Sequence, residues 1–321
     1  MRRPFAERRD WRAIADQALI VALGGALVWL LVRETAAELQ ARGISHGFAF
    51  LFEPAGFAIG EGVLDFDGAQ PYWRAFAAGL LNTLRATAAG LALATGIGLA
   101  VGVGALAGNP LLRALARGYV EIFRNIPLLL QLLTWYFLIG DRLPTADAAL
   151  NPWPGIFLSK GGLVLPWGGA VPVRGPFAIE GGATLTPEFL TVSLGLGCYT
   201  AAYLAEIVRA GVLAVPRGLV EAAAALGLTA GQRLRWVVLP LALRLILPPA
   251  TSQILNLAKN ASLAVVVGYP DLVSVANTSL NQTGQAVECL AIVVAVYLLL
   301  SLAAALVLAR ANARAQGRGR G

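Results

Sequence analysis

The chain has 321 residues, of which 57% are hydrophobic and only 13% are charged, and its mean hydropathy is +0.69. This composition lies far outside the range of soluble globular proteins and indicates a polytopic membrane protein. The net charge of +7 reflects how basic residues are shared between the two sides of a membrane, and it does not indicate a nucleic-acid-binding surface.

Six segments are apolar over about the 20 residues that a helix needs to cross the hydrocarbon core. They run from Ala13 to Val32, Leu80 to Leu106, Tyr119 to Ile139, Phe189 to Val208, Leu241 to Ala258 and Leu290 to Ala309. All six are predicted to be helices, because an open sheet leaves its backbone groups unsatisfied in lipid, so the predicted fold class is all-α. A further apolar segment, Ala261 to Val267, is too short to cross and is predicted to be a broken or half-spanning helix.

The first apolar segment follows an arginine-rich start. It is long for a secretory signal, and no convincing cleavage site of small residues follows it, so we expect an uncleaved first span. With the N-terminus inside, most arginines fall in the segments 1–12, 113–117, 209–244 and 310–321. This positive-inside pattern predicts that both termini are cytoplasmic and places residues 216–240 in the cytoplasm.

A short hinge joins the fourth and fifth apolar segments. Glu221 opens the run Glu221-Ala222-Ala223-Ala224-Ala225-Leu226-Gly227, which predicts a small-faced helix that Gly227 ends. Thr229 and Gln232 then fit a capping box that starts a second helix, and Leu239-Pro240 closes the segment. A rigid cytoplasmic knob is one interpretation; the alternative is that Glu221 only caps its helix and the hinge merely joins two spans.

Several kinds of site are not predicted. A phosphate-binding P-loop needs a Gly-Lys pair, whereas Lys160 and Lys259 follow Ser159 and Ala258. His46 is the single histidine, and Cys198 and Cys289 are far apart, so we expect no metal site and no cofactor in this chain. Both cysteines are expected to be packing residues.

The hinge resembles the EAA loop of ABC importer membrane subunits, and its surroundings extend the resemblance. The segments Tyr119 to Gln131, Ala201 to Arg209, Leu247-Pro248-Pro249 and Lys259 to Ala264 are similar to motifs of the polar amino-acid permease family. The resemblance covers roughly Gly79 to Ala309. Leu219 is a departure, because the family usually has Gln after the glycine at position 218.

The segments Arg42 to Phe48, Ala55 to Phe57 and Phe157 to Leu163 resemble the broad-specificity general L-amino-acid importers, which carry an extra first span. The implied organisation is a basic arm, first span and outside loop in residues 1–78, a transmembrane domain of type I importer fold in 79–309, and a basic cytoplasmic tail in 310–321. The EAA loop occupies about 216–240.

The resemblance implies an ATP-driven importer of L-amino acids in the bacterial inner membrane, of which this chain is the non-enzymatic permease subunit. The implied partners are ABC ATPase subunits that hold ATP and Mg, a second permease (a related or an identical chain), a periplasmic amino-acid-binding protein, and membrane lipid. The implied ATPase-coupling residues are Glu221, Ala222, Ala223, Gly227, Leu239 and Pro240. An ion-gradient-driven secondary transporter or channel subunit is the alternative function.

Polar residues inside the spans are the other candidates, because ionisable groups are costly at that depth. Glu121 with Arg124, and Glu206 with Arg209, have the spacing of structural ion pairs on one helix face. The cluster Asn256, Lys259, Asn260 and Ser262 follows a span that we expect Pro248-Pro249 to interrupt, and it either lines the substrate path or forms a polar plug between helices. Gln131 is grouped with the substrate path.

Two regions leave alternatives open. Gly90, Gly96, Gly98, Gly102 and Gly104 in the second span allow close approach to another helix, or else reflect loose packing. The outside loop from Asp141 to Pro187 carries Trp153 and Trp167 and either contacts a binding protein or lies at the lipid interface.

Overall fold

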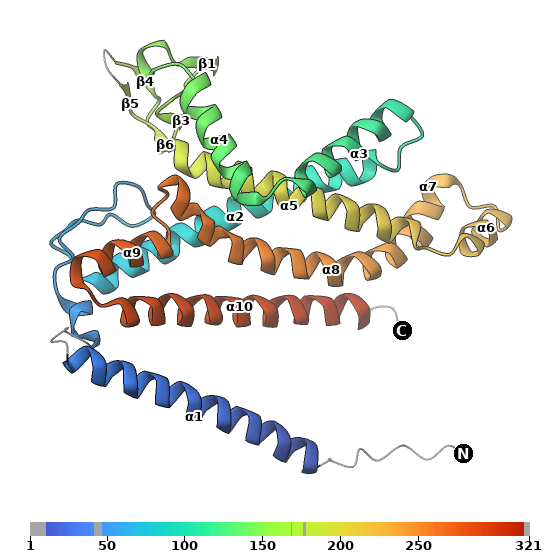
Figure 1. Cartoon of the computed structure of the whole chain (residues 1–321). Coiled ribbons are helices and arrows are strands. Elements are labelled where there is room, and N and C mark those ends of the chain that lie inside the picture. Colours follow the sequence, from blue (N-terminus) through green and yellow to red (C-terminus); the bar gives the residue numbers. More distant parts are fainter. Residues whose placement is uncertain (1–10, 42–46, 168, 176–177, 318–321) are drawn as a thin grey trace.

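The computed structural model describes residues 11–41, 47–167, 169–175 and 178–317, and long helices dominate it (Figure 1). The α-helices are α1 (Trp11–Ala41), α2 (Tyr72–Gly104), α3 (Pro110–Asn125), α4 (Leu128–Arg142), α5 (Pro187–Leu213), α6 (Arg217–Ala225), α7 (Ala230–Arg233), α8 (Leu239–Asn260), α9 (Leu272–Thr283) and α10 (Ala286–Gly317). Short 3₁₀ helices cover Phe48–Phe52, Ala146–Ala148 and Ala261–Val267, and a π-helix covers Leu234–Val238.

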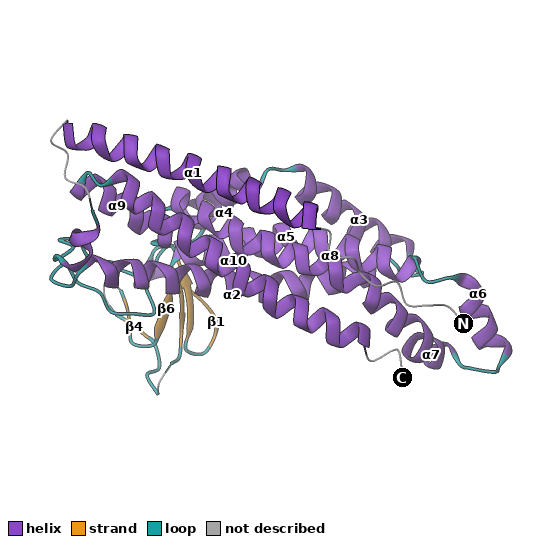
Figure 2. Ribbon diagram, turned by 90° about the horizontal axis from the view of Figure 1, so that it is seen from below, coloured by secondary structure: helices purple, strands orange, loops and turns teal. Residues whose placement is uncertain are grey.

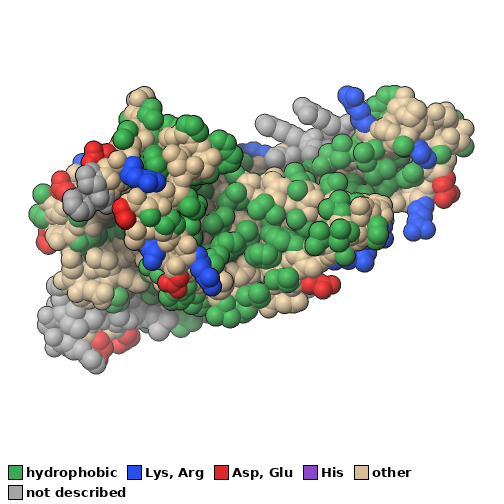
Figure 3. Space-filling view, turned by 90° about the horizontal axis from the view of Figure 1, so that it is seen from above, with side chains coloured by type: hydrophobic (Ala, Val, Ile, Leu, Met, Phe, Trp, Pro, Cys, Tyr) green, Lys and Arg blue, Asp and Glu red, His purple; other side chains and the backbone are tan. Residues whose placement is uncertain are grey.

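The molecule is elongated, and its two ends differ. The hinge end consists of α6, α7 and the turns around them (residues 214–240), and the sheet end carries the described strands and α9 (Figures 1 and 2). Between them, the face shown in Figure 3 is largely hydrophobic, with charged side chains gathered toward the ends. This distribution is typical of a bundle that spans a bilayer.

The core is the pair α2 and α5, whose contact rests on glycines. A Cβ at Gly98 would lie 2.8 Å from Cβ of Leu204, and one at Gly102 would lie 2.9 Å from the carbonyl oxygen of Ala205. The two backbones therefore pack as closely as their atoms allow. Gly96 meets nothing within 4 Å, so only some of the glycines of α2 serve close approach.

Among the described residues, four helices are long and apolar enough to cross a membrane: Tyr72–Gly104, Pro187–Leu213, Ala230–Val267 and Ala286–Arg310. A fifth span arises if the bent pair of α3 and α4 counts as one. The predicted first span lies within α1, whose described apolar stretch is Ala15–Leu27; some of its side chains lie outside the described ones.

The predicted third span, Tyr119 to Ile139, is wrong as an unbroken helix, because α3 and α4 meet at 106°. Pro127 forces the preceding residue toward extended backbone, and Ile126 has φ −93° and ψ 125°. The side chain of Gln131 donates to the carbonyl oxygens of Phe123 and Ile126 at 2.8 and 2.9 Å. The amide thus satisfies two carbonyl groups at the bend.

The expected interruption at Pro248-Pro249 is also wrong, because α8 continues through both prolines. Each proline removes the amide donor to the carbonyl four residues before it, yet helices within membranes tolerate this loss through local adjustment. The 3₁₀ helix Ala261–Val267 follows α8 directly and ends at Gly268, which has φ +79°. The predicted half-spanning element therefore exists as a tightened extension of α8.

The segment between α4 and α5, predicted as a loop, contains sheets. Strands β1 (Leu150–Trp153), β2 (Ile156–Ser159), β3 (Gly162–Leu165) and β6 (Ala183–Leu185) form an antiparallel sheet in that order, and β4 (Val173–Arg174) pairs with β5 (Ile179–Glu180). Apolar alternation buries Phe157 and Val164 beneath the larger sheet. Trp153 and Trp167 remain 68% and 75% exposed, a geometry that both alternatives for this loop allow.

Candidate functional sites

The hinge is specified on both sides of its turn, as the sequence predicts. The amides of Gly227 and Leu228 donate to the carbonyl oxygens of Ala224 and Ala223, and Gly227 has φ +81°. These bonds are a Schellman motif, which ends α6 and needs a residue without a Cβ.

The second half of the turn is a complete capping box. The Thr229 amide donates to Oε1 of Gln232 at 2.9 Å, and the Gln232 amide donates to Oγ1 of Thr229 at 3.4 Å. Because both termini are satisfied from within the turn, the angle between α6 and α7 is fixed locally.

The outer surface of α6 carries apolar side chains without a cover. Leu226 is 81% exposed and Leu219 is 47% exposed, while Ala223 is buried against the hinge. Glu221 and Ala222 are exposed between them. Glu221 lies beyond the first turn of α6, which begins at Arg217, so the alternative that Glu221 only caps its helix is wrong. A projecting apolar surface with one carboxylate is therefore the main feature of this end.

Leu239 and Pro240 do not end the hinge segment, contrary to expectation. The π-helix Leu234–Val238 joins α7 to α8, and the Leu239 amide donates to the carbonyl oxygen of Leu234. Pro240 lies in the first turn of α8 and has no amide to donate, and the π-helix that precedes it has a wider turn than an α-helix. The helix therefore continues without a break from α7 through the π-helix into α8, and it links α6 to the membrane interior.

The predicted polar cluster at the end of α8 does not converge on one cavity. Lys259 lines a mostly apolar cavity of about 340 Å³ between α2, α8 and α10, together with Thr83 and Tyr297. Asn256 is exposed and Asn260 is half-buried, and neither lines this cavity. The Ser262 hydroxyl donates to the carbonyl oxygen of Lys259 at 2.9 Å.

Gln131 lies elsewhere, at the bend between α3 and α4. Its side chain is buried, and its amide nitrogen is committed to the two carbonyl oxygens of the bend. The local geometry therefore gives this residue a structural task beside its predicted place on the substrate path.

Only one of the two predicted ion pairs is formed. Arg209 donates from Nη2 and Nε to the two carboxylate oxygens of Glu206 at 2.6 and 2.9 Å. Within the described residues, no ion pair joins Glu121 to Arg124; the Arg124 guanidinium instead lies over the Tyr203 ring, 5.1 Å from its centroid.

A second ion pair, between Arg85 and Glu61, was not predicted. Their side chains approach to 3.1 Å, and Glu61 also accepts a bond from the Thr186 hydroxyl. The Arg85 guanidinium lies 4.1 Å from the centroid of the Phe189 ring. An arginine within an apolar span is usually paired with an acidic group. The position of Arg85 in such a span is therefore the sequence signal that could have indicated a carboxylate partner.

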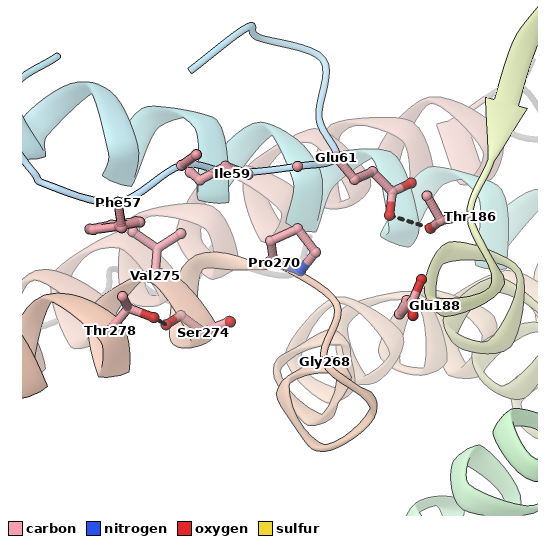
Figure 4. A pocket seen from close by; sticks show the side chains of 12 residues that line it. Phe57, Ile59, Glu61, Thr186, Glu188, Gly268, Pro270, Ser274, Val275 and Thr278 are labelled. Carbon is pink, nitrogen blue, oxygen red and sulfur yellow. Dashed lines mark hydrogen bonds between the residues drawn. The ribbon is translucent and has the colours of Figure 1, made fainter. Parts of the chain in front are cut away.

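This ion pair borders a pocket of about 380 Å³ at the sheet end (Figure 4). Phe57 and Ile59 of the segment 53–71 face Pro270 and Val275, and Glu61 and Glu188 lie toward the start of α5. Burial raises the pKa of Glu61 above its ordinary value, although Thr186 and Arg85 favour the carboxylate. The pocket joins three segments that are far apart in the sequence.

The chain is similar to known membrane transport proteins. Residues 92–317 match the family described as binding-protein-dependent transport system inner membrane component. The chain belongs to this family. It is therefore a membrane component, a permease, of such a transport system.

Three similar proteins agree with the assignment. The permease is 38% identical to the putative amino-acid ABC transporter permease protein YhdX of Escherichia coli, over 87% of each chain. It is 36% identical to the general L-amino acid transport system permease protein AapQ of Rhizobium johnstonii, over 90% of this chain and 88% of that one. A solved amino acid ABC transporter with histidines is 25% identical, with a TM-score of 0.58, over 76% of this chain and 95% of that one.

The residues that match the family model, 92–317, cover only part of the permease. This range begins within α2 and includes the hinge, the end of α8 and the residues of both predicted ion pairs on α3 and α5. Helix α1, the segment 53–71 and Glu61 precede it. The matched range also contains the described strands and α9, so it extends from the hinge end to the sheet end.

Proposed function

We propose that the permease is the membrane-spanning subunit of an ATP-driven importer of L-amino acids with broad specificity. It would act in the bacterial inner membrane with separate ATPase subunits, a second permease subunit and a periplasmic amino-acid-binding protein. The names of YhdX and AapQ support this substrate class.

The observation that carries the proposal is the uncovered apolar knob on α6. A locally rigid helix that exposes Leu219 and Leu226 at the end of the molecule fits a groove on a partner protein. Continuity from α7 into α8 gives movement of that partner a direct route to the bundle. ATP and Mg would bind to the partner, and α6 would transmit its closure.

Orientation follows from the charge pattern. Basic residues are concentrated near the hinge end and the two termini, so we place this end in the cytoplasm and the sheet end outside. The same orientation brings α6 to the side where ATP is available.

The test is affinity purification of the permease from gently solubilised native membranes, followed by mass spectrometry and an ATP-dependent uptake assay. We expect an ATPase to accompany the native chain. Gly227→Asp should uncouple uptake while leaving the permease inserted, because it places a side chain and a charge at φ +81° in the turn.

Gly231→Ala is the matched control, since Gly231 is exposed and helical, and no atom lies within 4 Å of a Cβ added there. Normal uptake by the Gly227→Asp variant would remove the coupling role of the turn. A chain that purifies alone and carries out ion-driven flux would establish the secondary transporter instead.

A further inference from the structure

A cavity of about 370 Å³ between α3 and α5, toward the hinge end, is lined by charges of both signs. Arg117, Glu121 and Arg124 come from α3, and Glu206 and Arg209 come from α5. The volume lies within the lower part of the range of small-molecule sites, which is roughly 300–1,000 Å³. We call this space the charged cavity.

Its charges are only partly neutralised from within. Glu206 and Arg209 form a closed pair with two hydrogen bonds. Among the described residues, no ion pair or hydrogen bond engages the side chains of Arg117, Glu121 or Arg124. Two arginines and one glutamate therefore face the cavity, with one positive charge in excess.

The position of Arg124 is constrained. Its guanidinium lies over the Tyr203 ring, 5.1 Å from the centroid, and this cation–π contact favours one position of the side chain. Arg117, Arg124 and Glu206 all line this cavity. A guanidinium presented in this way can bind a carboxylate through two parallel hydrogen bonds.

We propose that the charged cavity is a binding site for a free amino acid, distinct from the residues predicted at the end of α8. Arg124 and Arg117 bind the carboxylate groups, and Glu121 binds the ammonium group. Because one arginine is in excess, the site prefers acidic amino acids to basic ones. The inference rests on the proposed function, since it takes the cargo of the importer to be an amino acid.

The geometry favours this over a purely structural role. Arg117, Glu121 and Arg124 are all exposed and form no ion pair among the described residues, so a ligand can reach all three. Glu121 and Arg124 line the same cavity and lie three residues apart on one helix, yet they do not pair with each other. Glu206 and Arg209, in contrast, satisfy each other within α5.

The test is equilibrium binding of radiolabelled L-glutamate to the purified transporter complex in lipid nanodiscs, without ATP and without binding protein. We expect Arg124→Gln to weaken glutamate binding at least tenfold, and the native complex to bind L-lysine at least fivefold more weakly than glutamate. Arg310→Gln removes an exposed charge on α10, outside the cavity, and should stay within twofold of native.

Two further variants separate the alternatives. Arg124→Lys keeps the charge but loses the two-bond geometry, and should bind with intermediate affinity in a complex that assembles normally. Unchanged glutamate binding in Arg124→Gln, with binding lost in Lys259→Gln, would overturn the proposal and assign the ligand to α8.

The experiments distinguish failure of the proposed function from failure of the proposed binding site. A native complex that lacks ATP-driven uptake but shows Arg124-dependent binding would refute the importer while leaving the site in place. If Arg117, Glu121 and Arg124 pair with the second permease instead, Arg124→Gln would lower recovery of that subunit without changing glutamate affinity, and that result would overturn the site.

Discussion

At the scale of single residues, the turn that precedes α9 contains a carboxyl group in a costly place. Asp271 is fully buried, and its Oδ1 accepts a hydrogen bond from the Ser274 amide at 2.8 Å, which caps α9. Its other oxygen has no partner among the described residues. Burial raises the pKa of Asp271 to about 7, although backbone hydrogen bonds favour the charged form.

This shift predicts that the fold loses stability as the pH rises. The folded-state pKa of Asp271 lies above the ordinary aspartate value of 3.8, so the folded chain holds this proton more tightly than the unfolded chain. The contribution to stability is therefore present at acidic pH and declines between about pH 4 and pH 7. Asp271→Asn keeps an oxygen for the cap but cannot ionise, and should remove this component.

The measurement is the thermal denaturation midpoint of the purified permease in detergent between pH 5 and pH 8. We expect the native midpoint to fall more steeply over this range than that of the Asp271→Asn variant. Glu61, which also has a raised pKa, is present in both proteins, so the difference between the two profiles isolates Asp271. Parallel profiles would show that Asp271 is not protonated in the folded chain.

At the scale of elements, the contact between α2 and α5 should be the least tolerant of added volume. Gly98→Val places a Cβ 2.8 Å from that of Leu204 and 3.1 Å from the Ala201 carbonyl oxygen. Overpacking of this kind costs typically about 1–3 kcal/mol. Gly96→Val introduces the same side chain into the same helix where no atom lies within 4 Å.

Thermal denaturation of the two variants in the same detergent distinguishes these positions. The Gly98→Val midpoint should lie well below that of Gly96→Val, because both share any effect of valine on helix propensity. Equal midpoints would mean that α2 and α5 separate at little cost. In that case the glycines would reflect composition rather than close packing.

Helix identity was largely predictable because apolar length and the backbone requirements of lipid leave few choices. The hinge was predictable as well, since a Schellman turn at Gly227 and the capping box at Thr229 are local signals. The bend was missed although Pro127 is a local signal for it; the bond from Gln131 to the Phe123 carbonyl oxygen, eight residues earlier, is the part that the sequence does not show. Strands of two to four residues between α4 and α5 are likewise too short for periodicity to identify.

Side-chain pairing across the bundle was the weakest part of the prediction. Spacing on one helix placed Glu206 beside Arg209 correctly, but the same spacing failed for Glu121 and Arg124. The Tyr203 ring of a different helix takes the place of the carboxylate at Arg124. Arg85 finds Glu61, which lies 24 residues earlier, on a loop. Such partners are determined by the tertiary arrangement, which one helix face does not encode.

At the scale of the whole molecule, the helices divide into a core and a periphery. In the most apolar 18-residue stretch of α5, 72% of the residues are buried, whereas none are buried in the corresponding stretch of α10. The outward face of α10 exposes Leu290, Leu298 and Leu302, so lipid or a second permease must cover it. The hinge end and the sheet end lie beyond this belt (Figure 3), and they should be reached by reagents from opposite sides of the membrane.

This arrangement makes the orientation testable with a membrane-impermeant maleimide. Leu226→Cys places a thiol at the exposed hinge end, where the native side chain is 81% exposed. Lys160→Cys places one at an exposed position between β2 and β3 at the sheet end. We expect Lys160→Cys to react in intact spheroplasts, and Leu226→Cys to react only in inside-out membrane vesicles. The native chain is the control, because Cys198 and Cys289 are both buried and should not be labelled. If Leu226→Cys were labelled from the outside, the orientation of the permease would be the reverse of the one proposed. Helix α6 would then lie outside the cytoplasm, where its apolar surface could not contact an ATPase.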